Sequence, residues 1–145
     1  MERRFLVDVM LGKLATYLRM CGYDALYANE EELDADGAIR KRAETAGRTL
    51  LTRDQTLAAQ TEGAICLTAT TIENQLTELH EQGVPIDLPT TPKRCSLCNG
   101  SVTQIDSSQH PNHAPDTEER VWQCTDCDQY FWKGSHWDDV RSRLP

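Results

Sequence analysis

The spacing of apolar residues changes from that of a strand to that of a helix near the start of the chain. A short apolar run over residues 5–7 ends directly on the carboxylate of Asp8. Runs of this kind are typical of buried strands. Apolar residues then follow helical spacing, at Leu11, Leu14, Ala15 and Leu18. The pattern predicts a strand, Asp8 at its carboxyl end, and a helix that follows at once.

The same succession repeats as far as residue 83. Further strands are predicted over residues 24–27, 49–52 and 64–67. Further helices are predicted over residues 36–46, 55–60 and 72–79, with glycines at 22, 47 and 83 placed to end helices. Strands alternating with helices are typical of the α/β class with a mostly parallel sheet. Ligands bind such open sheets at the carboxyl ends of the strands, where Asp8 is expected, although Asp is also common in plain turns.

The composition changes after residue 83. Residues 84–92 hold three prolines in nine positions, which predicts a stiff linker. We therefore expect an α/β domain over residues 1–83, a linker over 84–92 and a second, small domain over 93–145.

The second domain carries two Cys-x-x-Cys pairs, separated by 25 residues: Cys95, Cys98, Cys124 and Cys127. Two such knuckles supply the four thiolates of a tetrahedral zinc site, which predicts a structural zinc ribbon with a polar loop over residues 104–119. His110 and His113 fall in that loop and are expected to be solvent-exposed. Cys21 and Cys66 lack a partner motif and are expected to pack as small apolar residues.

Three aspartates of the first domain fall at predicted junctions between elements. Asp8 and Asp54 each follow a strand, and Asp36 opens a helix. Carboxylates gathered at one sheet edge repel each other unless a cation lies among them, and Mg²⁺ or Mn²⁺ prefers such oxygen ligands. Helix capping is an alternative explanation for Asp36 and Asp54, and Asp34 competes for the position of Asp36.

Basic residues near these aspartates could contact phosphate. Lys13 lies one turn beyond Asp8, and Arg53 adjoins Asp54. A further basic group over residues 40–48 could either bind a phosphodiester backbone or pair with nearby glutamates. In the second domain, the aromatic stretch 130–137 could stack unpaired bases on Trp132 beside Lys133, or pack the core of the ribbon.

The overall charge bears on possible partners. Net charge is −8, with 23 acidic residues against 15 Lys and Arg. This balance disfavours bulk attraction to nucleic acid or to a membrane, and the scarcity of Lys also fits adaptation to a high-salt cytoplasm. No apolar run approaches the ~20 residues that span a bilayer, and the start of the chain is unlike a signal peptide. We therefore expect a cytoplasmic protein without membrane contact.

Four motifs together resemble the Mut-seven C-terminal ribonuclease-like family: FLVDVMLGKLATYLRMCGYD, GRTLLTRD, CSLCNG and CTDCDQYFWKGSH. That resemblance implies a PIN-like three-layer sandwich followed by a zinc ribbon. The resemblance places the family's acids on Asp8, Asp36 and Asp54. Asp36 is assigned by its distance along the sequence from Gly47 and Arg48. A fourth acid, common in PIN nucleases, is not evident: Thr68 occupies that neighbourhood, and Glu73 is the nearest carboxylate.

The candidate site residues and the resemblance to this family together lead to one hypothesis for the function. It is a metal-dependent endoribonuclease that cuts RNA, with Mg²⁺ or Mn²⁺ at the three aspartates, Lys13 and Arg53 on phosphate, and structural zinc in the ribbon. One alternative is a non-catalytic module that binds RNA or protein. Another is a toxin-like PIN protein, which the attached ribbon disfavours.

Overall fold

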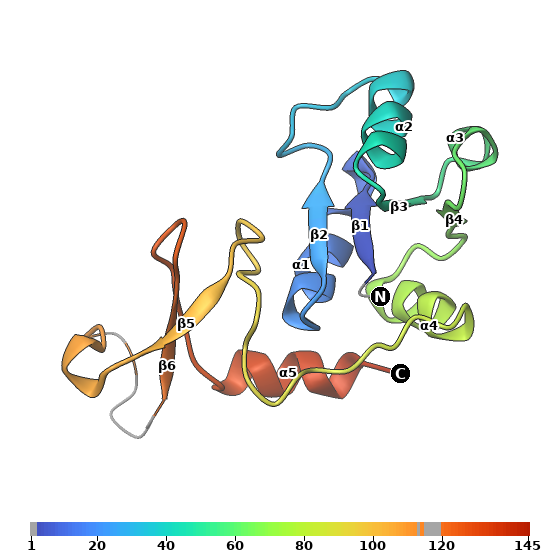
Figure 1. Cartoon of the computed structure of the whole chain (residues 1–145). Coiled ribbons are helices and arrows are strands. Elements are labelled where there is room, and N and C mark those ends of the chain that lie inside the picture. Colours follow the sequence, from blue (N-terminus) through green and yellow to red (C-terminus); the bar gives the residue numbers. More distant parts are fainter. Residues whose placement is uncertain (1–2, 113, 115–119) are drawn as a thin grey trace.

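The first half of the chain folds into a four-stranded parallel sheet with helices on both faces (Figure 1). The computed structural model describes residues 3–112, 114 and 120–145. The strands are β1 (Arg4–Val7), β2 (Asp24–Tyr27), β3 (Thr49–Thr52) and β4 (Ile65–Cys66), in the order β2-β1-β3-β4. A 3₁₀ turn, η1 (Val9–Leu11), leads into α1 (Gly12–Met20), and the other helices are α2 (Asp36–Thr45), α3 (Gln55–Gln60) and α4 (Ile72–Glu81). The predicted α/β class is confirmed. We call these elements the α/β body.

Side chains alternate between the two faces of the sheet and so build two cores. Phe5, Val7 and Leu51 join the core that also holds residues of α1 and α4. Leu6 and Leu50 join the opposite core, with residues of α2 and α3. Because successive residues of a strand point to opposite faces, fully apolar strands require cover on both sides. The three-layer sandwich is therefore confirmed.

The direction in which successive strands are added to the parallel sheet reverses between β1 and β3. From β1 the chain crosses to β2 by way of α1, then returns past β1 to β3 by way of α2, which packs in the opposite core. Such a reversal opens a crevice at the carboxyl ends of the two central strands, which is where open α/β sheets bind ligands. Asp8 directly follows β1, and Asp54 lies two residues beyond β3.

The chain beyond residue 83 contributes to the core of the α/β body. Val84 and Ile86, in the predicted linker, are buried there, and the hydroxyl of Tyr23 donates to the carbonyl of Pro85 at 2.7 Å. A C-terminal helix that the sequence analysis did not predict, α5 (Ser135–Arg143), runs back beneath the body (Figure 1). Its Val140 is buried in the same core.

The second half of the chain forms a small antiparallel sheet that carries the cysteines. Its strands are β5 (Val102–Ile105), β6 (Val121–Cys124) and β7 (Tyr130–Phe131), and a 3₁₀ turn, η2 (Ser107–Gln109), follows β5. This architecture confirms the predicted ribbon. The expectation of solvent-exposed histidines is wrong for His110, which is partly buried. His113 lies outside the described residues.

Buried polar contacts fix the ribbon to the edge strand β2. The side chain of Asn99 accepts from the backbone N–H of Ala25 at 2.9 Å and donates to Asp24 at 2.7 Å. The buried guanidinium of Arg19 donates to the Ala25 carbonyl at 2.9 Å and to the carbonyls of Ser96 and Leu97. An edge strand exposes unpaired backbone groups. Here Asn99 of the first knuckle and Arg19 of α1 satisfy both backbone polar groups of Ala25, so the first knuckle lies against this edge.

Candidate functional site

The four ribbon cysteines form a compact group of metal-ligand atoms, which we call the cysteine cluster. All four sulfurs lie within 4.8 Å of one another. Two of the S···S separations are 3.6 Å, Cys95 to Cys127, and 3.5 Å, Cys98 to Cys124. A tetrahedron of sulfurs each ~2.3 Å from zinc has edges of about 3.8 Å, close to these separations. The cluster can therefore hold a metal ion such as zinc.

The two knuckles are built alike. Asn99 and Asp128, the residues directly after the second cysteine of each pair, have φ angles of 72° and 66°. Asn and Asp adopt this left-handed conformation more readily than other non-glycine residues. Gly100 lies so close to the cluster that an added Cβ would be 3.0 Å from the sulfur of Cys124. The local sequence, including CNG and CDQ, thus favours the turn that each knuckle needs.

The thiols of the cluster differ in acidity. Desolvation by burial raises the pKa of Cys98 to about 12, and hydrogen bonds with the neighbouring thiols add to this increase. The pKa of Cys124 is lowered: burial opposes its ionisation, but the N–H groups of Asp126 and Cys127 donate to its sulfur, each at 3.4 Å. Backbone dipoles thus favour a thiolate at Cys124, the form in which cysteine binds a metal.

A second group of polar side chains lies at the reversal point of the parallel sheet. We call it the carboxyl edge and define it by Asp8, Thr52 and Asp54. The side chain of Asp8 is buried, and its oxygens accept from the hydroxyl of Thr52 at 2.6 Å and from the N–H of Val9 at 2.8 Å. The hydroxyl oxygen of Thr52 in turn accepts from the N–H of Asp54 at 3.0 Å. A single threonine of β3 therefore connects the carboxylate of Asp8, after β1, to the backbone N–H of Asp54.

The third predicted acid stands apart from this group. Asp36 is exposed in the first turn of α2, where Ala35 is the N-cap residue, and Asp34 is exposed too. The sequence alternative of helix capping holds for Asp54, whose Oδ1 accepts from the N–H groups of Thr56 and Leu57. Among the described residues, the cysteine cluster alone brings three or more ligand atoms within 4.8 Å, so the three aspartates do not.

Glutamates of α4 stand near the two cations expected to contact phosphate. Glu78 accepts from the N–H groups of Thr68 and Ala69, and its pKa is lowered because these bonds, with the nearby Arg53, outweigh desolvation. Lys13 lies close enough to Glu73 to help lower the pKa of that carboxyl. Glu78, rather than Glu73, is thus the carboxylate beside Thr68. Sequence spacing carries little signal for this contact, because Glu78 reaches the loop from the second turn of α4.

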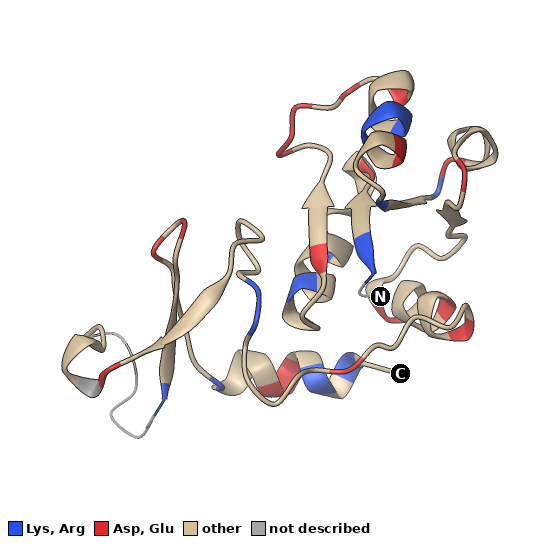
Figure 2. Ribbon diagram, viewed as in Figure 1, with Lys and Arg blue, Asp and Glu red and all other residues tan. Residues whose placement is uncertain are grey.

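The basic group over residues 40–48 is partly engaged in ion pairs. Arg42 donates to Glu31 at 2.8 Å, and the largely buried Arg48 donates to Asp24 at 2.8 Å. Basic and acidic residues are interspersed along α2 and α5 (Figure 2). Phosphate contact at the carboxyl edge would therefore depend on individual cations, and Lys13 and Arg53 are both exposed.

Sequence reasoning missed three residues that organise these sites: Thr52, Arg19 and Asn99. Thr52 begins the triplet Thr52-Arg53-Asp54, yet a buried strand threonine gives no sign that its hydroxyl will donate to the carboxylate of Asp8. Cys21 and Cys66, the two cysteines outside the cluster, are half-buried. Desolvation by burial raises the pKa of the Cys21 thiol to about 12.

Comparison with known proteins places the chain in a family. Residues 3–144 match the model of the Mut7-C RNAse domain. No curated protein and no solved structure matches the chain. No helix among the described residues is long and apolar enough to cross a membrane. Because the family model covers nearly the whole chain, this protein belongs to the Mut7-C RNAse domain family.

Proposed function

We propose that this protein is a metal-dependent endoribonuclease whose reaction takes place at the carboxyl edge. One observation carries the proposal: the buried carboxylate of Asp8 accepts from the hydroxyl of Thr52, which accepts from the backbone N–H of Asp54, at the reversal point of the sheet. This is where open α/β sheets bind their ligands. Membership of a nuclease-type family supplies the class of substrate, RNA.

The donors at this edge fit a hard divalent cation. Mg²⁺ and Mn²⁺ favour carboxylate oxygens, and Mg²⁺ is commonly held by one or two carboxylates together with water and substrate phosphates. Asp8 and Asp54 would be those carboxylates, with Asp36 joining from the start of α2. Such an ion would supply Lewis-acid chemistry, activating water and stabilising the leaving oxygen.

The chain's own residues would orient these carboxylates and the RNA. The hydroxyl of Thr52 and the N–H of Val9 hold the carboxylate of Asp8 in one orientation. Lys13 and Arg53 would bind phosphate on either side of the scissile bond. The ribbon, with a structural zinc, would hold its shape and assist RNA binding. The cluster thiols require a reducing compartment, so we place the protein in the cytoplasm.

Cleavage of an end-blocked single-stranded RNA tests the proposal. The zinc-loaded protein should cut the RNA internally when Mn²⁺ or Mg²⁺ is added and should not cut it when neither is present. Omitting the ion is preferable to EDTA, because a chelator would also attack the ribbon.

Asp8→Asn and Asp54→Asn should each reduce the cleavage rate on the order of 100-fold, as when one charge-stabilising group is removed from an active site. Asn caps helices as well as Asp, so the second change leaves α3 capped. Asp87→Asn, which changes an exposed aspartate in the segment between α4 and β5, is the matched control and should retain the wild-type rate. Full activity in both test variants would refute the proposal.

A non-catalytic RNA-binding module is the second candidate. It is favoured by the spread of the three aspartates and by the use of Asp54 as a helix cap. In that case the wild-type protein would bind RNA but leave it intact with either ion.

A further inference from the structure

A cavity of about 400 Å³ lies where the ribbon meets the α/β body, away from the carboxyl edge. Its lining comes from three parts of the fold: Met20 at the end of α1, Ser96 and Leu97 in the first knuckle, and the stretch from β7 into α5. Binding sites for small organic groups are concave, mostly apolar and about 300–1,000 Å³ in volume. The cavity falls within this range.

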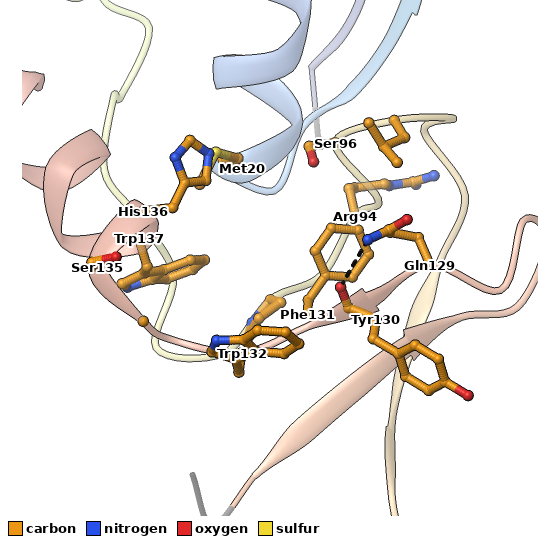
Figure 3. Close-up of a pocket in the computed structure, with 13 residues that line it drawn as sticks. Met20, Arg94, Ser96, Gln129, Tyr130, Phe131, Trp132, Ser135, His136 and Trp137 are labelled. Atoms are coloured by element: carbon orange, nitrogen blue, oxygen red, sulfur yellow. Dashed lines mark hydrogen bonds between the residues drawn. The ribbon is translucent and has the colours of Figure 1, made fainter. Parts of the chain in front are cut away.

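Aromatic rings form one wall of this cavity. Figure 3 shows Phe131, Trp132 and Trp137 along the same side, while Tyr130 turns its ring away. Gly134 permits this arrangement, because an added Cβ would lie 3.0 Å from the indole nitrogen of Trp132. Leu97, at the rim, leaves 57% of its surface exposed. Leu97 therefore extends the apolar surface that the aromatic rings offer to a ligand.

The charge around the cavity is unlike that of the whole chain. The chain carries a net charge of −8, yet all thirteen lining residues are described and none of them is acidic. Arg94 lines the cavity; it donates to the carbonyl of Asn99 at 3.1 Å and lies 3.9 Å from the carboxylate of Asp24. The ammonium of Lys133 lies 5.6 Å from the centre of the Trp137 ring. A flat aromatic surface with cations at its edge is complementary to a group that carries both a planar ring and a negative charge.

We infer that this cavity binds one unpaired base of RNA, stacked on the aromatic wall, with the adjoining phosphate near Arg94 and Lys133. The inference rests on the proposed function, because RNA is the substrate proposed there. Proteins that bind single-stranded RNA combine stacking surfaces with nearby cations in this way. A peptide would use the aromatic wall but would not need the cations, so charge complementarity favours RNA.

The position of the cavity separates this role from catalysis. Met20 is the last residue of α1, whereas Asp8 precedes the turn that leads into its first. At a rise of about 1.5 Å per residue, the length of α1 puts the two places roughly 12 Å or more apart. A base held in the cavity would therefore anchor the strand at a distance from the scissile bond.

Variants that fill or charge the cavity test the inference without removing packed side chains. The full-length, zinc-loaded protein is titrated against a fluorescein-labelled nine-nucleotide single-stranded RNA without added Mg²⁺ or Mn²⁺. Ser135→Trp should fill the cavity and Leu97→Glu should place a charge at its rim. Each should weaken binding between about 5- and 150-fold, the range that corresponds to one stacked base.

Matched controls carry the same changes elsewhere. Ser142→Trp lies near the other end of α5 and Thr103→Glu on β5; both positions are exposed and neither lines the cavity. They should bind RNA like the wild type. Trp132→Leu should weaken binding and Trp132→Phe, which keeps a stacking face, should restore most of it. Zinc content and thermal midpoint show that each variant is folded.

The outcomes distinguish this inference from the proposed function. If Ser135→Trp and Leu97→Glu bind the RNA as tightly as their controls, the cavity does not hold a base, even when the wild type cuts RNA. If the cavity variants bind more weakly while the wild type cuts nothing, the base site stands and the nuclease proposal fails. Equal binding of the wild type to this RNA and to its blunt duplex would also overturn the inference, because paired bases cannot enter the cavity.

Discussion

The cysteine cluster and the carboxyl edge differ in how completely the fold assembles them. In the cluster, four sulfurs from two knuckles lie within 4.8 Å of one another. At the carboxyl edge, a threonine connects Asp8 to Asp54, and Asp36 remains exposed at the start of a helix. The cluster has the geometry of a structural site, closed and complete. At the edge, the third acid stays apart from the other two.

The assembly of each site depends on the chain in a different way. A Cys-x-x-Cys pair places two ligands through one short turn, so only two pieces must meet. Each aspartate comes from a separate strand or helix, and Asp8 and Asp54 already accept hydrogen bonds from neighbouring backbone groups, as the capping of α3 by Asp54 shows. The hydrogen-bonded connection between ribbon and β2 also makes the cluster part of the structural support for the α/β body.

The largest effect is expected from removing one cysteine ligand. Cys124→Ser should abolish tight zinc binding and unfold the ribbon, because metal binding supplies on the order of 10 kcal/mol to small domains of this kind. Metal analysis should fall from about one zinc per chain to none, and the emission of the buried Trp122 should move to longer wavelength. Cys66→Ser, outside the cluster, should keep its zinc. A folded, zinc-containing Cys124→Ser protein would contradict the structural role.

A smaller effect is expected from breaking the connection between ribbon and body. Asn99→Ala removes the bonds to Ala25 and Asp24 and strains a residue at φ 72°, and should lower the free energy of unfolding by about 2–4 kcal/mol. Asp128→Ala, at φ 66° in the other knuckle, tests strain alone and should lower it by about 1 kcal/mol. If Asn99→Ala and Asp128→Ala lower the free energy of urea unfolding equally, the hydrogen bonds of Asn99 contribute nothing to stability.

The smallest effect is a dependence of stability on pH at Asp24. Burial works to raise the pKa of this carboxyl, but hydrogen bonds from Arg48 and Asn99 outweigh it and hold the pKa below its usual range. The stabilisation is therefore complete above the unfolded-state pKa of about 3.9 and is lost as the pH falls through the folded-state value. In urea unfolding, the difference between wild type and Asp24→Asn should shrink below about pH 4. A difference that stays constant from pH 3 to pH 7 would contradict this.

Local sequence patterns predicted much of the α/β body. The strands 24–27 and 49–52 and the helix 55–60 have the predicted bounds, because apolar periodicity and nearby glycines act within a few residues. Asp8 was likewise placed correctly at the end of β1. The cysteine spacing predicted the cluster for the same reason.

Features that depend on tertiary contact were not predicted. Helix α5 buries only Trp137 and Val140, too few apolar positions to reveal a helix before the core it joins is known. Asn99 reads as a turn residue, and its contact with β2 spans 74 residues of chain. The aromatic stretch 130–137 fits both packing and binding in the sequence, and the cavity beside it is formed by residues that lie far apart in the chain.

A crystal soaked in Mn²⁺ gives the sharpest test of a divalent metal site at the carboxyl edge. Anomalous scattering should show Mn²⁺ bonded to a carboxylate oxygen of Asp8 and close to Asp54, distinct from any metal held by the cysteine cluster. The peak should be absent from crystals of Asp8→Asn. A soaked wild-type crystal with no manganese at this edge, or with an equal peak in the variant, would contradict the claim.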